Sequence, residues 1–330
     1  MQTYLVTGAA GFIGSAFVES LRGSVSVVSV DRLSHFKSRP EHDRIAMGEL
    51  VDRDHLWEWL ENPSNAKRIS AIVHMGACSR TTETDEAFLR QVNVEYSQKL
   101  WTFATRKKIP FVYASSAATY GDGTRGYDDV ESQIAQLRPL NAYGESKRLF
   151  DLWALEEERA GRCPPAWAGF KFFNVYGFGE RHKGGMASVV LHAYDQIRER
   201  GSVRLFRSHR PDIADGHQTR DFISVEDVVE VLHFALEKPI RRGIFNLGTG
   251  HARTYLDLAQ VTFKALGREP KIEFIDTPEA IRSKYQYFTE ARMDRLRDEG
   301  YLKPFISLEE GVRSYLDRLR LLGSSPVKGG

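Results

Sequence analysis

The sequence contains very little cysteine. Only Cys78 and Cys163 occur among its 330 residues, and nothing in their spacing resembles a metal site. We therefore expect reduced thiols and a cytoplasmic location. The 10 histidines show no ligand spacing, such as a pair four residues apart around a glutamate, so the sequence predicts no metal site.

Long apolar runs and an excess of one charge are also missing. No stretch approaches the length of a membrane span, and the apolar residues from Tyr4 are typical of a strand rather than of a signal peptide. The net charge is +2, with scattered arginines and lysines, so we expect neither a nucleic-acid nor a membrane partner. The length suits one large α/β domain, or one with a smaller lobe.

A glycine-rich turn near the N-terminus predicts a dinucleotide site. A short buried strand at Tyr4–Val6 is followed by Gly8, Gly11 and Gly14, and then by an apolar helical pattern. Strand, glycine turn and helix in this order let the backbone approach a pyrophosphate at the helix N-terminus.

The next predicted strand, Val25 to Val30, ends in Asp31, an acid placed to bind an adenosine ribose hydroxyl. Asp31 alone favours NAD, because its carboxylate would repel a 2′-phosphate. The neighbouring Arg32 can hold that phosphate, with help from Lys37, Arg39 and Arg53. We therefore expect NADP, with NAD as the alternative.

Tyr143 and Lys147 are the most informative pair in the chain. Residues four apart share one face of a helix, so the phenol and the ammonium should lie side by side. A nearby cation favours the phenolate, and we therefore expect a lowered pKa at Tyr143, which would make it a useful base. The same spacing also occurs on ordinary surface helices, but Ser116, at the end of an upstream strand, could hold a substrate hydroxyl against the tyrosine.

Strand-like and helical stretches alternate up to Asn174. We expect strands at 3–7, 25–31, 71–75, 111–115, 168–174, 243–247 and 271–275. We expect helices at 12–21, 54–60, 83–107, 142–158, 225–236 and 307–321. The alternation predicts a Rossmann-type doubly wound parallel sheet with helices on both faces. Residues 1–173 and 221–250 should form the dinucleotide-binding domain, residues 174–220 and 251–322 a smaller substrate-binding lobe, and residues 323–330 a disordered tail.

These motifs resemble the extended short-chain dehydrogenase/reductase family, whose members act on nucleotide sugars. The glycine turn, Ser116, Tyr143, Lys147 and the segment Asn246–Gly250 carry the resemblance. Four further segments narrow it to one group of ADP-sugar epimerases, and the similarity runs from Tyr4 to about Leu319. These segments are Gly76–Glu83, Phe173–Gly177, His182–Ser188 and Lys284–Thr289.

The resemblance implies a role for each matching residue. Tyr143, Lys147, Ser116 and Lys183 would be catalytic. The cofactor would be bound by Gly8, Gly11, Phe12, Ile13, Gly14, Asp31, Arg32, Lys37, Arg53, Met75, Gly76, Ala77, Cys78, Ser79, Asn93, Tyr143, Lys147, Val175 and Lys183. The substrate would be bound by Ser116, Asn174, Gly185, His192, Phe206, Arg220 and Tyr285. The resemblance also implies a homo-oligomer, specifically a pentamer.

Arg220 suits a diphosphate, because a guanidinium binds one bidentately, but a surface ion pair with Asp221 is an alternative. His192 and Tyr285 could be core residues, and Lys183 could serve only to neutralise the diphosphate. The sequence departs from the family pattern in a longer segment at 208–219 and in Gly185, which stands where a serine is expected. Another sugar-nucleotide epimerase or dehydratase, or a non-catalytic dinucleotide-binding regulator, would share the fold.

Overall fold

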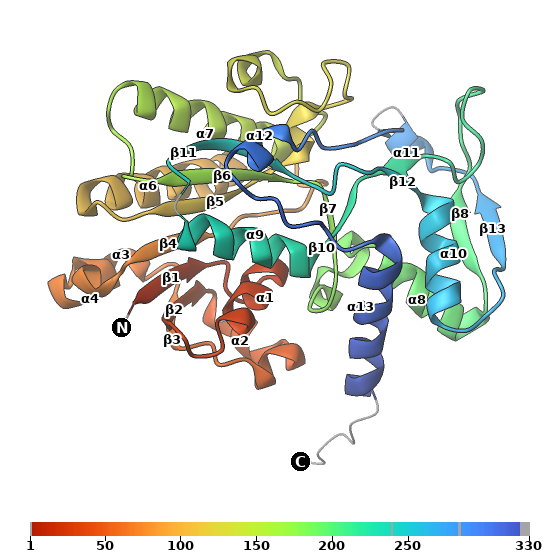
Figure 1. Cartoon of the computed structure of the whole chain (residues 1–330), viewed down its shortest axis with the longest axis horizontal. Coiled ribbons are helices and arrows are strands. Elements are labelled where there is room, and N and C mark those ends of the chain that lie inside the picture. The colour runs from red at the N-terminus through yellow and green to blue at the C-terminus, as the bar shows by residue number, and fades with distance from the viewer. Residues whose placement is uncertain (1, 239, 283–284, 324–330) are drawn as a thin grey trace. The chain divides into compact units, whose positions relative to one another are not determined.

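The computed structural model describes residues 2–238, 240–282 and 285–323 (Figure 1). Residues 324–330 of the predicted tail, and Lys284 of the last motif, lie outside the described residues. The chain forms two compact units. Unit 1 comprises residues 1–172, 228–247 and 292–302, and unit 2 comprises residues 173–227, 248–291 and 303–330.

Unit 1 is built on a parallel sheet of seven strands in the order β11-β6-β5-β4-β1-β2-β3. The strands are β1 (Thr3–Thr7), β2 (Ser26–Asp31), β3 (Glu49–Asp52), β4 (Ala71–His74), β5 (Phe111–Ser116), β6 (Trp167–Phe172) and β11 (Arg242–Leu247). Every residue of β1, β4 and β6 is buried, as expected for a sheet covered on both faces. The doubly wound α/β prediction is confirmed, although β3 was not predicted.

Helices cover both faces of this sheet. In Figure 1, α6 and α7 lie on one face and α1 and α9 on the other. The helices are α1 (Phe12–Leu21), α2 (Leu33–Lys37), α3 (Leu56–Glu61), α4 (Pro63–Arg68), α5 (Glu86–Leu89), α6 (Tyr96–Lys107), α7 (Ala142–Arg159), α9 (Val225–Glu237) and α12 (Asp294–Asp298). The single helix predicted for 83–107 is wrong, because a π-helical turn, Arg90–Glu95, separates α5 from α6.

The strand order creates a topological switch point between β1 and β4. From β1 the chain proceeds to β2 and β3 on one side, and it then returns to β4 on the other side of β1. The loops that leave the carboxyl ends of β1 and β4 diverge there, which is where sheets of this kind bind ligands.

Unit 2 packs three helices around an apolar core. They are α8 (Val189–Arg200), α10 (Tyr255–Ala265) and α13 (Leu308–Gly323). The core includes Tyr176, Leu191, Leu258, Val312 and Tyr315, all buried. Three two-stranded sheets complete the unit: β7 (Asn174–Tyr176) with β10 (Phe222–Ser224), β9 (Thr219–Arg220) with β12 (Arg253–Thr254), and β8 (Val203–Phe206) with β13 (Ile272–Ile275). A short helix, α11 (Glu279–Arg282), follows β13.

The unit boundaries differ from those predicted. Residues 173, 221–227 and 248–250 belong to unit 2, and residues 292–302 belong to unit 1. The strand predicted for 168–174 is also wrong. It ends at Phe172, and Asn174 begins a separate strand that pairs with β10. Helices α8 and α10 were not predicted from the sequence.

Candidate active site

The glycine turn forms a close backbone approach at the switch point. Gly8 has a φ of +66°, and a Cβ there would lie 2.6 Å from the amide nitrogen of Gly76. A Cβ at Gly14 would lie 2.1 Å from the carbonyl oxygen of Gly8. Helix α1 begins at Phe12, next to Ile13, and no side chain caps its N-terminus. Its first amide groups are therefore available to an anion, as a pyrophosphate site requires.

Asp31 closes β2 beside this turn. Its carboxylate accepts hydrogen bonds from the amides of Ala10 at 3.2 Å and Arg32 at 2.8 Å, and it contacts Nδ1 of His35 at 2.9 Å. Burial lowers the pKa of the Arg39 guanidinium, and the charge of Asp31 opposes that effect. The acid is thus surrounded by donors and basic groups, an environment compatible with either form of the cofactor.

The remaining cofactor residues of unit 1 follow the carboxyl ends of β2, β3 and β4. Arg53 directly follows β3. Lys37 is the last residue of α2, the helix that follows β2. Met75, Gly76, Ala77, Cys78 and Ser79 form the loop after β4. Asn93 anchors that loop, because its amide oxygen accepts from the Cys78 amide at 2.8 Å and its amide nitrogen donates to the Cys78 carbonyl at 3.0 Å.

Asn93 lies within the π-helical turn. It also donates to Oγ of Ser146 at 2.9 Å, and Ser146 in turn donates to the carbonyl oxygen of Tyr143 at 2.7 Å. The π-helical turn therefore places the side-chain amide of Asn93 between the loop after β4 and helix α7. Single π-turns inside helices are frequent at functional sites.

Ser116, Tyr143 and Lys147 come together at the carboxyl end of β5. Ser116 ends that strand, and its hydroxyl lies near enough to the phenol of Tyr143 to influence the pKa of that group. Asn141 caps α7 by accepting from the amide of Gly144 at 2.8 Å, which fixes the turn that carries Tyr143. Lys147, one turn later, donates from Nζ to the carbonyl oxygen of Ala114 at 2.8 Å. The predicted catalytic residues of unit 1 are thus neighbours.

The expected lowering of the Tyr143 pKa is wrong for the chain by itself. Tyr143 is 8% exposed, and burial raises its pKa; the Ser116 hydroxyl opposes the change, while Cys78 and Asp151 add to it. Burial likewise lowers the pKa of Lys147 to about 8, against the charges of Asp151 and Cys78. Loss of water around both side chains outweighs their mutual effect.

In unit 2, Lys183 lies on a tight turn, Arg181–Met186, where Gly184 adopts a φ of +54°. The turn is held by Glu180, which is fully buried. Its carboxylate accepts from the amides of Gly177 at 3.3 Å and Ser188 at 2.6 Å, and from the Ser188 hydroxyl at 2.6 Å. Burial lowers the pKa of Lys183, and the charge of Glu180 opposes that effect.

Arg220 lies between two aromatic rings. Its guanidinium carbon is 5.5 Å from the ring centre of Tyr255 and 5.6 Å from that of Tyr285, and Phe206 contacts Tyr285 at 6.4 Å between ring centres. The three predicted substrate residues Phe206, Arg220 and Tyr285 therefore form one cluster. A cation flanked by aromatic rings suits a nucleoside diphosphate.

The alternative ion pair between Arg220 and Asp221 is not formed. Asp221 is fully buried and accepts from the amides of Thr249 at 2.7 Å, Gly250 at 2.9 Å and Ala291 at 3.0 Å. It also accepts from the Thr249 hydroxyl at 2.7 Å. The carboxylate is thus a structural hub for the segment Asn246–Gly250.

The other predicted substrate residues are spread over unit 2. Asn174 is exposed and begins β7, where Val175 is half-buried. Gly185 follows Gly184 in the Lys183 turn, and the space that a Cβ would enter there is open. His192 is half-buried on α8 and not in the core. Tyr285 is likewise half-buried.

The long segment at 208–219 is an ordered loop between β8 and β9. Asp215 accepts from the Ser208 amide and from the Arg207 guanidinium, both at 2.8 Å. The His209 amide donates to the phenol oxygen of Tyr287 at 3.1 Å, and Arg210 lies 5.3 Å from the Tyr287 ring centre. These contacts attach the loop beside the aromatic cluster.

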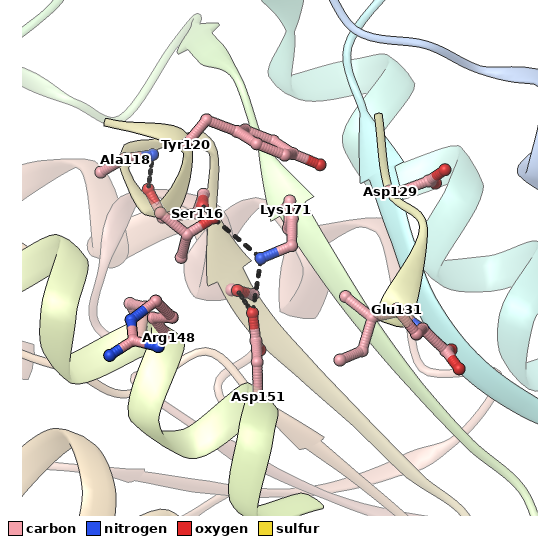
Figure 2. A network of polar contacts seen from close by, with 12 residues as sticks. Ser116, Ala118, Tyr120, Asp129, Glu131, Arg148, Asp151 and Lys171 are labelled. Carbon is pink, nitrogen blue, oxygen red and sulfur yellow. Dashed lines mark hydrogen bonds and ion pairs between the residues drawn. The ribbon is translucent and has the colours of Figure 1, made fainter. Parts of the chain in front are cut away.

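Sequence reasoning missed a buried polar network below Ser116 (Figure 2). The side chains of Lys171 and Asp151 are both fully buried, at 0% exposure, and they form an ion pair at 2.6 Å. Two signals pointed to it. Lys171 interrupts an otherwise apolar strand, and Asp151 stands one helical turn after Lys147.

Within residues 2–238, 240–282 and 285–323, no group of three or more histidine, cysteine or acidic side chains could hold a metal ion. Over the same residues, every helix is too short or too polar to cross a lipid bilayer.

Two curated relatives are named ADP-L-glycero-D-manno-heptose-6-epimerase. The one from Fusobacterium nucleatum is 45% identical over 94% of this chain and 96% of its own. The one from Nitratidesulfovibrio vulgaris is 49% identical over 95% of this chain and 96% of its own. The resemblance found in the four segments is confirmed along almost the whole chain.

Solved structures agree with this result. The Helicobacter pylori ADP-L-glycero-D-manno-heptose-6-epimerase matches with a TM-score of 0.79 and 28% identity, over 97% of this chain and 96% of that one. A Thermus thermophilus UDP-glucose 4-epimerase solved with NAD matches with a TM-score of 0.74 at 23% identity, which supports the fold alone. The model of the NAD dependent epimerase/dehydratase family matches residues 4–248. The chain belongs to the NAD dependent epimerase/dehydratase family.

Proposed function

We propose that this chain is an NADP-dependent isomerase that converts ADP-D-glycero-D-manno-heptose into ADP-L-glycero-D-manno-heptose by inverting C6″. The observation that carries the proposal is the 45–49% identity, over more than nine-tenths of the chain, to curated enzymes of that name. The grouping of Ser116, Tyr143 and Lys147 at the carboxyl edge of the sheet supports a dehydrogenase-type reaction.

The backbone at the switch point fits a dinucleotide. The backbone at Gly8 lies so close to that of Gly76 that Gly8 has no space for a side chain. The uncapped start of α1 offers amide groups to a pyrophosphate. The chemistry that bound NADP supplies is reversible hydride transfer to and from a sugar carbon. Asp31 would bind the adenosine ribose, and Lys147 the nicotinamide ribose.

The side chains of unit 1 would manage the proton at the reacting oxygen. Ser116 donates a hydrogen bond to that oxygen, and Tyr143 removes the hydroxyl proton as C6″ becomes a ketone. The positive charge of Lys147 opposes the effect of burial and favours the phenolate form of Tyr143.

Two epimers present their hydroxyl groups differently, so a single base serves both poorly. We assign the second acid–base role to Lys183. Burial already lowers its pKa, which increases the neutral fraction that can accept a proton. In the same unit, Arg220, Phe206 and Tyr285 would bind the ADP moiety, and Asn174, Gly185 and His192 would lie along the sugar.

The proposal extends to the context of the enzyme. The product would serve lipopolysaccharide core synthesis, and the enzyme would act in the cytoplasm as a homo-oligomer, a pentamer by family resemblance. Size-exclusion chromatography with light scattering measures the assembly directly.

A direct assay tests the function. Purified protein is incubated separately with ADP-D-glycero-D-manno-heptose and with UDP-glucose, and epimer exchange at each sugar carbon is followed. Exchange at C6″ of the heptose alone supports the proposal. Exchange of UDP-glucose alone would identify a different sugar-nucleotide epimerase, and exchange of neither would favour a non-catalytic dinucleotide-binding protein.

Heavy water distinguishes the mechanism. Because hydride returns to the carbon from which it came, the product formed in heavy water should carry no deuterium at C6″. Nuclear magnetic resonance of the recovered product gives the result. Deuterium at that carbon would show that a carbanion exchanges with solvent, and it would exclude the ketone route.

Cofactor choice depends on Arg32 in this proposal. We expect Arg32→Ala to lower the preference for NADP over NAD by about 10- to 100-fold, the effect of losing one charge-assisted hydrogen bond of roughly 1.5–3 kcal/mol. Binding titrations with both cofactors measure the ratio. Lys67→Ala, on α4, is the control and should leave it unchanged. An unchanged ratio in Arg32→Ala, with a changed one in Arg39→Ala, would assign the phosphate contact to Arg39.

A further inference from the structure

We propose that Asp151, held by Lys171 beneath the catalytic groups, is a positioning residue that sets the charge state of both Tyr143 and Lys147. The inference deepens the proposed function, since it rests on a reaction carried by these two side chains.

The pair is isolated from solvent and fully engaged. Besides Lys171, the carboxylate of Asp151 accepts from the hydroxyl of Ser115 at 2.8 Å and from the phenol of Tyr113 at 3.0 Å. Lys171 also donates to the hydroxyl of Thr119 at 2.8 Å. Burying two charges costs several kcal/mol, and apolar replacements of such pairs are often as stable. Stability alone is therefore a weak reason for this arrangement.

The network touches both elements of unit 1 that carry a catalytic group. Ser115 directly precedes Ser116 in β5, and the Thr119 hydroxyl donates to the carbonyl oxygen of Ser116 at 2.8 Å. Asp151 lies on α7, one turn after Lys147 and two turns after Tyr143, and all three side chains belong to the buried face of that helix. The carboxylate of Asp151 thus connects β5, which carries Ser116, with α7, which carries Tyr143 and Lys147.

The charge of Asp151 acts on both side chains in the same direction. It opposes the burial that lowers the pKa of Lys147, and it adds to the burial that raises the pKa of Tyr143. Among the other groups that face them, Cys78 acts in the same sense on both. His74, whose pKa burial lowers to about 3, is neutral and adds no charge.

The sign of the expected change follows. Activity needs a deprotonated Tyr143 together with a protonated Lys147, so the pKa values of both side chains together set the two limbs of the pH profile. Asp151→Asn removes the negative charge, leaves Lys171 uncompensated, and therefore lowers both pKa values. Both limbs should move to lower pH, by about one pH unit, at the lower end of the range for a neighbouring charge.

The experiment measures kcat/KM for the heptose substrate against pH in the holoenzyme. A second readout is the phenolate absorbance of Tyr143, taken as the difference between each protein and the same protein carrying Tyr143→Phe. This titration reports the effect of Asp151 even if the chain acts on another substrate. Absence of epimerisation by the unmodified protein would contradict the proposed function and not this inference.

Matched variants separate charge from structure. Asp129→Asn removes another buried carboxylate of unit 1, which accepts from the amide of Asn246 at 2.8 Å, and it should leave both limbs in place. Lys171→Arg keeps the cation and should also leave them in place. If Asp151→Asn does not fold, the double variant Asp151→Leu/Lys171→Met removes the pair together, and its limbs should move to lower pH by a smaller amount.

Movement of both limbs and of the phenolate titration to lower pH supports the proposal. A uniform loss of activity at every pH, with both limbs and the titration unmoved, would overturn it. Limbs that move apart, or to higher pH, would overturn it as well.

Discussion

Tyr143→Phe is expected to block oxidation of one heptose epimer, and Lys183→Met is expected to block oxidation of the other. Each variant removes one acid–base group, so the affected epimer should react about 10²- to 10⁴-fold more slowly. The unaffected epimer should react within a few-fold of the normal rate. Single-turnover reactions with each purified epimer, followed by the absorbance of the reduced cofactor, measure both rates.

Local contacts hold Tyr143 and Lys183 in place, each within its own unit. Tyr143 is fixed by the capped start of α7 and by its own burial. Lys183 is carried by a turn that the buried carboxylate of Glu180 ties to Gly177 and Ser188. Each of the two side chains is thus held in place by contacts inside its own unit.

Lys183→Arg tests whether charge alone suffices. An arginine keeps the cation but cannot give up its proton near neutral pH, so it should fail as a base while still attracting the diphosphate. If Lys183→Met oxidises both epimers at near-normal rates and only binds them more weakly, Lys183 is an electrostatic anchor and the two-base mechanism is wrong.

Asp221→Ala is expected to cause a large decrease in the free energy of unfolding. The substitution leaves the amides of Thr249, Gly250 and Ala291 without their acceptor inside unit 2. Each buried amide without a partner costs about 1–3 kcal/mol, so the total should be about 3–5 kcal/mol, among the largest effects of single substitutions. Urea denaturation followed by circular dichroism measures the change.

Two further variants calibrate that result. Asp221→Asn keeps one acceptor oxygen and should lose less stability than the alanine variant. Asp212→Ala removes a solvent-exposed aspartate paired with Arg210, and it should leave the denaturation midpoint unchanged. Equal midpoints for Asp221→Ala and the unmodified protein would contradict the role of Asp221 as a hub.

Much of the sheet could be predicted because its strands are continuous apolar runs. Strand β1 and helix α1 match their predicted bounds, and the glycine turn between them lies at the switch point of the sheet. Strand β3 was missed because two of its four residues, Glu49 and Leu50, are exposed and the apolar signal is correspondingly weak. Helix α10 was missed, although Thr254 and Asp257 form a capping box that marks its start.

The errors at the candidate site have three different physical causes. The Tyr143 pKa depends on burial, which spacing along a helix does not reveal. The Arg220–Asp221 pair was plausible from adjacency, but neighbouring residues in extended chain point in opposite directions. The π-helical turn depends on the bonds that Asn93 makes to Cys78 and Ser146, which are distant in sequence.

The way in which the chain alternates between its two units constrains its biosynthesis. Each unit is assembled from three separate segments. Strand β11, at the edge of the central sheet, is synthesised only after residues 173–227 of unit 2. Arg295, which donates to the carbonyl oxygen of Ile244 and to Glu131, leaves the ribosome later still. Neither unit can therefore be completed from one continuous fragment, and a nascent chain must keep the open edge of its sheet from pairing with other chains until β11 arrives.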